Sequence, residues 1–281
     1  MKRLRIEHTT GFDYQGDVGA SYNEARMLPS STDSQFVLSS QLDIEPSTSV
    51  AHYVDYFGTR VAAFDVLAAH SSLTITARSL VEVRQRPLTH GDMTWDQLAR
   101  EAPRAIGTVE MLGGSGRTAA HPDVAELAAS IAGQHATPSR AALAITEAVG
   151  GAVEYVAGAT GVNSTAAEAW EERKGVCQDI AHIALGALRS VGIPARYVSG
   201  YLHPDPSAEI GVPVVGESHA WVEWFAGSWQ GFDPTNHAEI GDRHVLVGRG
   251  RDYDDVPPLR GVYAGVVGSR LRVQVQITSE A

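Results

Sequence analysis

The sequence has one cysteine, no long apolar run and few positive charges, and each shortage excludes a class of protein. A single cysteine, Cys177, in 281 residues leaves no internal disulfide. No stretch approaches the roughly 20 apolar residues that span a bilayer, so we expect no membrane partner. Lys and Arg number 22 against 33 Asp and Glu, and the net charge of −11 argues against nucleic acid as a partner.

The N-terminal residues also lack the signal of an exported protein. MKRLRIEHTT is basic, but it alternates apolar and polar residues and has no apolar core of a signal peptide. The expected location is therefore the cytoplasm. A content of 43% hydrophobic and 20% charged residues is ordinary for a globular protein, and the length allows one large or two modest domains.

The first 86 residues show the pattern of β-strands. Apolar residues alternate with polar ones in short runs between turn signals, which is typical of an antiparallel sheet or sandwich. The clearest runs are Leu4–His8, Phe36–Ile44, Tyr53–Phe57, Leu73–Ile75 and Val81–Val83. Pro87 and the polar residues up to 95 indicate a boundary, so the predicted domains are a β-rich region at 1–88 and a second domain at 89–281.

Helical periodicity replaces this pattern beyond residue 120. Pro122 and Pro138 begin two helices with one apolar face, and Thr165 has the spacing of a capping box with Glu168. The clearest helix runs over 177–191 and ends at Gly192. Strands are expected at 195–202, 219–225 and 228–233. The order of strands, helices and strands predicts an α+β fold.

Cys177 lies at the predicted start of the clearest helix, two residues after Gly175. Free backbone N–H groups and the helix dipole give a first turn partial positive charge, which favours a thiolate over a thiol and stabilises a developing oxyanion. A free cysteine is also a common buried apolar residue. Its position alone therefore leaves both interpretations open.

The segment SHAWVEWFAGSWQGFDPTN is predicted to form a β-hairpin that turns at Ala226 and Gly227. With the turn centred on residue 226, His219 and Asp233 are cross-strand partners on one face, with Cβ atoms roughly 5 Å apart. An aspartate at this distance fixes an imidazole through one ring nitrogen and leaves the other for a nucleophile. The inference depends on the register, because a shift of one residue places the two side chains on opposite faces.

Three blocks contain these residues: GVCQDIAHIALGALRSVGIPARYVSGYL, ESHAWVEWF and WQGFDPTN. They resemble the core of the bacterial transglutaminase-like family, and NEARMLPSSTDSQFVLSSQLDIEPS and GRDYDDVPPLRG (250–261) are similar to one bacterial subgroup of it. The resemblance covers nearly the whole chain. It implies a β-sandwich-like domain followed by a papain-like core, in which the nucleophile helix packs on an antiparallel sheet. Cys177 is then the nucleophile, His219 the base and Asp233 the orienting acid.

Asp179 and His182 lie three residues apart on the cysteine's helix and, with His219 and Asp233, allow a metal site and hydrolase. No HExxH motif or cysteine cluster accompanies them, so we expect no metal and favour local hydrogen bonds that support the helix start.

Four other features have two interpretations or a simple structural one. Trp221 is expected in the core, with shielding of the imidazole as the alternative, and Gln178 is an oxyanion donor only if its side chain turns that way. Asn236 is expected to be a turn residue. The 250–261 segment is either a rigid surface loop or a wall of the cleft.

These residues predict an enzyme that forms an acyl-enzyme on Cys177 and cleaves or transfers at peptide, isopeptide or carboxamide bonds. Hydrolysis is favoured over amine transfer, because water is always present and no amine site is identifiable. The expected partner is a protein or peptide substrate. No cofactor is expected, nor calcium, because no EF-hand loop occurs. The alternative is a non-catalytic protein-interaction module on the same fold.

Overall fold

The computed structural model describes residues 1–85, 87–89 and 91–280. The first part of the chain forms six strands, as the alternation of its polar and apolar residues predicts. Their bounds are β1 Lys2–Val18, β2 Ser21–Ala25, β3 Gln35–Glu45, β4 Val50–Val54, β5 Arg60–Val66 and β6 His70–Val83. Two sheets pack face to face and bury residues such as Phe64, Leu73 and Ile75 between them. The predicted β-sandwich is confirmed.

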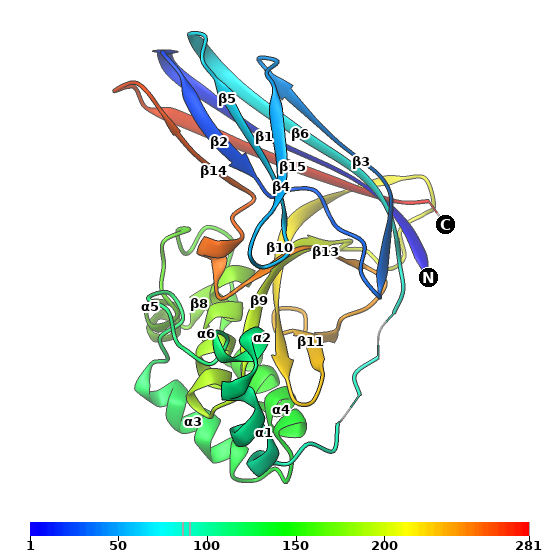
Figure 1. Ribbon diagram of the computed structural model, residues 1–281, viewed down its shortest axis with the longest axis vertical. Coiled ribbons are helices and arrows are strands. Elements are labelled where there is room, and N and C mark those ends of the chain that lie inside the picture. The colour runs from blue at the N-terminus through cyan, green and yellow to red at the C-terminus, as the bar shows by residue number, and fades with distance from the viewer. Residues whose placement is uncertain (86, 90, 281) are drawn as a thin grey trace.

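The last two strands, β14 (Leu259–Tyr263) and β15 (Ser269–Ser279), complete this sandwich. β14 pairs with β2 and β15 pairs with β1 in antiparallel register, although they belong to the region predicted as the second domain, 89–281. Figure 1 shows them beside the first strands, with the two chain termini close together. Of the predicted boundary segment 87–95, residue 90 lies outside the described residues. The division at 88 and 89 into two folding units stays a prediction.

The run predicted as a strand at Tyr53–Phe57 is too long, because β4 ends at Val54. Asp55 Oδ1 accepts the backbone N–H groups of Phe57 and Thr59, at 3.1 and 2.9 Å. An aspartate that bonds the backbone two residues ahead forms an Asx turn. Aromatic residues follow Asp55 in this turn, and for that reason the pattern predicted a longer strand.

The middle of the chain is helical. The main helices are α3 (Pro122–Ala132), α4 (Pro138–Ala152), α5 (Ala166–Glu172) and α6 (Cys177–Ser190). The predicted starts at Pro122 and Pro138 and the capping box of Thr165 with Glu168 are confirmed. Shorter elements are α1 (Trp95–Glu101), η1 (Ala102–Arg104), α2 (Ile106–Val109), β7 (Glu154–Tyr155) and β8 (Lys174–Gly175). Within the described ranges, no helix is both long and apolar enough to cross a membrane.

A central antiparallel sheet separates the helices from the sandwich (Figure 1). Its strands are β9 (Ala195–Leu202), β10 (Pro213–Phe225), β11 (Trp229–Asp233), β12 (Ala238–Glu239) and β13 (His244–Gly250), followed by η2 (Tyr253–Asp255). Helix α6 packs on it and buries Ile180, Ala184 and Leu188 with Val222 and Trp224. The predicted α+β fold, with a nucleophile helix packed on an antiparallel sheet, is confirmed.

Strand β10 belongs to both parts of the molecule. Its first four residues, 213–216, pair with β15 of the sandwich, and residues 217–224 pair with β9 of the central sheet. The strand that carries His219 is therefore paired with both the sandwich and the central sheet. Because the join is made by backbone hydrogen bonds, it fixes one edge of the site relative to the sandwich.

The predicted hairpin forms, but its turn is centred one residue later than predicted. Val222 pairs with Phe232 and Phe225 with Trp229, which centres the hairpin on Gly227. The turn uses three residues, 226–228, and Gly227 has a φ of +91°, which favours glycine. Asp233 therefore falls opposite Trp221 rather than opposite His219. Moving the centre by one residue moves each partner by two, so Asp233 stays on the predicted face.

Candidate active site

Cys177 is the first residue of α6, as predicted, and a local hydrogen-bond network holds this helix start. Asp179 Oδ2 accepts the N–H of Val176 at 2.8 Å and the hydroxyl of Thr160 at 2.5 Å. A Cβ atom on Gly175 would lie 2.7 Å from the Cβ of Asp179, so only glycine lets Asp179 fold back here. Asp179 therefore supports the helix start, and the glycine before the cysteine has a packing reason.

The first turn of α6 retains free hydrogen-bond donors. The N–H groups of Asp179 and Ile180 both donate to the carbonyl oxygen of Val176, at 3.0 and 3.1 Å. The N–H groups of Cys177 and Gln178 have no acceptor among the described residues. Unpaired N–H groups at a helix start, together with the helix dipole, stabilise negative charge. This is the environment that both a thiolate and an oxyanion require.

His219 connects the cysteine to the aspartate. Its Nε2 lies 2.7 Å from Asp233 Oδ2, and Cys177 lies close enough to influence the pKa of its ring. Burial alone lowers the pKa of His219, but the hydrogen bonds and negative charges of Asp233 and Cys177 outweigh it and raise the pKa to about 10. The structure therefore brings the three predicted residues together in the order Cys177, His219, Asp233.

Asp233 is completely buried and accepts five N–H groups. Oδ1 accepts the backbone N–H groups of Thr235 at 3.0 Å and Asn236 at 3.1 Å. Oδ2 lies near His219 Nε2, His244 Nε2 and Asn236 Nδ2, at 2.7, 3.2 and 2.8 Å. Burial raises the pKa of this carboxyl, but the two histidines overcome burial and hold the pKa well below its usual range. Asp233 is thus a fixed anion.

His244 is a site residue that sequence reasoning missed. Its Nδ1 accepts the backbone N–H of Gly241 at 3.2 Å, so the proton of the neutral ring is on Nε2 and points to Asp233. Burial is the largest effect on His244 and lowers its pKa, which keeps the ring neutral. No local signal marks it, because it lies on β13, beyond the predicted hairpin, and only the tertiary fold brings it to Asp233.

Asn236 is more than the turn residue that we expected. Its Nδ2 donates to Asp233 Oδ2 at 2.8 Å and lies 3.3 Å from His219 Nε2. The spacing of the turn gave a signal that could have been used, because the side chain of an asparagine three residues after an aspartate can reach back to it across the turn. Asn236 and His244 together hold the same carboxylate oxygen that His219 contacts.

The residues fit hydrogen bonding better than a metal. His219, Asp233 and His244 have ligand atoms within 4.8 Å of one another. A metal on His244 Nε2 would need the ring proton on Nδ1, where it would face the N–H of Gly241. His182, proposed above as a ligand, is buried and accepts the N–H of Tyr253 at 3.2 Å through Nε2. It lies outside this cluster, and so does Asp179.

Cys177 and His219 line a cavity of about 520 Å³. Its walls include the 155–162 segment, the central sheet and strand β15 of the sandwich. Tyr253 and Pro258 also line it, so the 250–261 segment is a wall of the cleft. Gln178 lines it too, but its Nε2 donates to the carbonyl oxygen of Val162 at 3.2 Å. The side chain of Gln178 is therefore already engaged.

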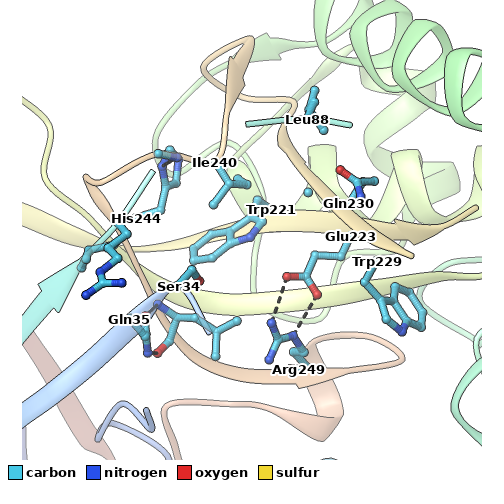
Figure 2. A pocket seen from close by; sticks show the side chains of 15 residues that line it. Ser34, Gln35, Leu88, Trp221, Glu223, Trp229, Gln230, Ile240, His244 and Arg249 are labelled. Carbon is cyan, nitrogen blue, oxygen red and sulfur yellow. Dashed lines mark hydrogen bonds and ion pairs between the residues drawn. The ribbon is translucent and has the colours of Figure 1, made fainter. Parts of the chain in front are cut away.

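A second, smaller cavity is lined by His244 and Trp221 (Figure 2). Trp221 fills the space between it and the site, 1% exposed, with its ring 6.2 Å from that of His219 and 5.4 Å from that of His244. The expectation that Trp221 lies in the core is confirmed, and its shielding of the imidazole stays a prediction. Glu223 is buried here and paired with Arg249 at 2.8 Å and Arg196 at 2.7 Å. This cavity has a volume of only about 40 Å³, against about 520 Å³ for the one beside Cys177.

Comparison with known proteins supports the assignment of family from both parts of the chain. Residues 4–82 match the bacterial transglutaminase-like N-terminal region, and residues 125–234 match the core of the transglutaminase-like superfamily. An uncharacterized protein of Mycobacterium leprae is 42% identical over 99% of both chains. The chain belongs to the transglutaminase-like superfamily.

Two further proteins are similar to this transglutaminase-like protein over almost its whole length. An uncharacterized protein of Mycobacterium tuberculosis is 31% identical over 98% of this chain and 92% of its own. A crystal structure of a candidate cysteine protease from Cytophaga hutchinsonii superposes with a TM-score of 0.73 over 99% of this chain and 97% of its own, at 19% identity. At that identity the similarity supports the fold.

Proposed function

We propose that the protein is a cysteine-nucleophile enzyme that cleaves or transfers at peptide, isopeptide or carboxamide bonds, with hydrolysis favoured over amine transfer. The observation that carries the proposal is one chain of contacts. His219 lies 2.7 Å from Asp233, Cys177 influences the pKa of the His219 ring, and Cys177 and His219 line the same cavity. A nucleophile, a base and an orienting acid in this arrangement are the general signature of covalent catalysis.

The reaction begins with a Cys177 thiolate and a protonated His219. The sulfur attacks the substrate carbonyl carbon, and the oxygen takes up negative charge near the free N–H groups of Cys177 and Gln178. His219 then donates its proton to the leaving nitrogen, the C–N bond breaks, and an acyl thioester remains on Cys177. Asp233 keeps its charge throughout and stabilises the imidazolium.

In the second half of the reaction, His219 removes a proton from water. The hydroxide attacks the thioester carbonyl, the C–S bond breaks, and the sulfur leaves as a thiolate beside the reprotonated His219. An amine in place of water would give transfer instead. A peptide or protein is the expected substrate, and the cavity beside Cys177 is the space where it would bind.

Alkylation and acyl trapping test the proposal. Iodoacetamide at pH 7 is expected to alkylate Cys177 at least about tenfold faster than free cysteine, and His219→Ala is expected to remove the acceleration. Activated esters are expected to add the mass of the acyl group to Cys177 when the reaction is stopped with denaturant. An ordinary alkylation rate that is insensitive to His219→Ala, with no acyl adduct, would favour the non-catalytic interaction module.

A screen against a peptide and isopeptide library identifies the substrate. Cys177→Ala, which retains the fold but lacks the nucleophile, serves as the matched control. Products that form with the wild type and are absent with Cys177→Ala define the bond that is cleaved, and incorporation of an added amine measures the share of transfer.

A further inference from the structure

The cleft has an uneven distribution of charge. The cavity of about 520 Å³ with Cys177 and an adjoining one of about 400 Å³ share Tyr155, Glu217 and His219 as lining residues. Apart from His219, whose proton serves the chemistry, no lysine, arginine or histidine lines either cavity in the described part of the chain. Glu217 is the one carboxylate among these lining residues. With Cys177 and His219 as a thiolate–imidazolium pair, it gives the cleft its net negative charge.

Glu217 is placed next to the reacting groups by the backbone. It lies two residues before His219 on β10, so the two side chains project from the same face of the strand. From the opposite wall, Tyr155 lies on β7, whose partner in β8 is Gly175, two residues before Cys177. The pairing of β7 with β8 therefore ties Tyr155, which contacts Glu217, to the segment that leads into Cys177.

A hydrogen bond across the cleft fixes the carboxylate. The hydroxyl of Tyr155 donates to Oε2 of Glu217 at 3.2 Å, and both residues line both cavities. Oε1 of Glu217 has no partner among the described residues, and the side chain is exposed to the cleft. One oxygen is therefore held by Tyr155, and the other is available to a ligand.

Building on the proposed function, we propose that Glu217 binds a primary ammonium group of the substrate beside the carbonyl that Cys177 attacks. An ammonium carries three donors and stays protonated at neutral pH, so it suits an oriented carboxylate with a free oxygen. A charge-assisted hydrogen bond of this kind is stronger than a neutral one. The same chemistry is offered by the side chain of a lysine and by the free N-terminus of a peptide.

The test uses matched pairs of chloromethyl ketones, which alkylate a catalytic cysteine and whose rates are followed by mass spectrometry at Cys177. One pair is α-blocked lysyl chloromethyl ketone and its Nε-acetyl form. The other is alanyl-alanyl chloromethyl ketone and its N-acetyl form. The readout is the ratio of rate constants within a pair, which does not depend on the overall reactivity of a variant.

At least one ratio is expected to reach about tenfold in favour of the ammonium in the wild type. The pair that shows it identifies the source, lysine side chain or peptide N-terminus. Glu217→Gln is expected to bring that ratio to within about twofold of one, and Tyr155→Phe to lower it less. Glu154→Gln is the control, because it removes the same negative charge from the residue next to Tyr155. Glu154 lines neither cavity.

Ratios near one for both pairs in the wild type would overturn the inference, as would a preference that survives Glu217→Gln. A preference lost equally in Glu154→Gln would also overturn it, since it would reflect net charge. The proposed function fails in a different way. In that case the neutral probes and iodoacetamide alkylate Cys177 no faster than free cysteine, whatever the ratios are.

Discussion

His244 Nε2 lies 3.2 Å from the same oxygen of Asp233 that accepts the hydrogen bond of His219. The backbone N–H of Gly241 fixes the tautomer that makes this contact, so His244 acts as a neutral donor and not as a second base. Its role is to position Asp233. A carboxylate held by several donors keeps both its charge and its orientation when the imidazole moves during catalysis.

The first prediction separates this positioning role from simple packing. Gln at position 244 can accept from Gly241 and donate to Asp233, whereas Leu can do neither. We expect His244→Leu to slow acylation of Cys177 by at least about tenfold, and His244→Gln to stay within about threefold of the wild type. Acylation by an activated ester, measured by stopped reaction and mass spectrometry, distinguishes them. Equal losses in both variants would show that only ring packing matters.

The second prediction concerns the protonation of His219. Its pKa is about 10 in the folded protein and about 6.5 in an unfolded chain. Because the folded value is higher, the stabilisation is fully present below pH 6.5 and is lost as the pH rises toward 10. We expect the difference in free energy of unfolding between the wild type and His219→Gln to shrink between pH 6.5 and 9.5, by about 2–4 kcal/mol at 1.36 kcal/mol per unit.

Urea unfolding at a series of pH values measures this difference. Asp233→Asn provides the control, because it leaves the histidine in place but removes its counter-charge. In that background the pH dependence attributed to His219 should largely disappear. If it persists, the imidazolium is held by something other than Asp233.

Two adjacent glycines give the third prediction. A Cβ atom on Gly150 of α4 would lie 2.2 Å from the carbonyl oxygen of Pro234, the residue after Asp233, whereas one on Gly151 would meet nothing within 4 Å. Gly151→Ala should stabilise the protein by about 0.5–1 kcal/mol, because alanine is the better helix former. Gly150→Ala should destabilise it by about 1–3 kcal/mol and slow alkylation of Cys177, because Pro234 must move. Thermal unfolding and iodoacetamide rates provide both readouts.

Local patterns were enough to predict the elements that carry the chemistry. The helix starting at Cys177 follows from apolar periodicity and from the glycine after it, and its bounds are those of α6 within a residue. The closeness of His219 and Asp233 follows from the hairpin, even though the turn has three residues. An error of one residue at the centre preserves the face, so the contact survived a wrong register.

Contacts between distant segments were beyond prediction. β15 pairs with β1 although more than 250 residues of sequence separate their paired residues, and the residue pattern of neither strand indicates which strand it pairs with. His244 and Tyr155 reach the site through that tertiary arrangement, and neither has a motif of its own. The sequence therefore predicts the three candidate catalytic residues, while the residues that hold and surround them emerge only when the sheets are assembled.

A buried histidine between the sandwich and the central sheet provides the last prediction. The hydroxyl of Tyr201 donates to the carbonyl oxygen of Met27 at 2.9 Å, so it accepts the proton on Nδ1 of His8 at 3.0 Å. Nε2 of His8 then accepts from the hydroxyl of Thr10 at 3.1 Å. Every position on the neutral ring is used, and a second proton on Nε2 would break the contact with Thr10.

Burial lowers the pKa of His8 to about 4, below the value of about 6.5 in an unfolded chain. As the pH falls from 6.5 to 4, the unfolded state gains a proton before the folded state does, so His8 makes the protein less stable in acid. We expect His8→Gln to cost stability at pH 7 and to recover about 2 kcal/mol relative to the wild type at pH 4.5. His52→Gln, at an exposed histidine, is the control and should show no such recovery in urea unfolding. A parallel response of the wild type and His8→Gln between the two pH values would mean that the junction of the two sheets tolerates a charged His8.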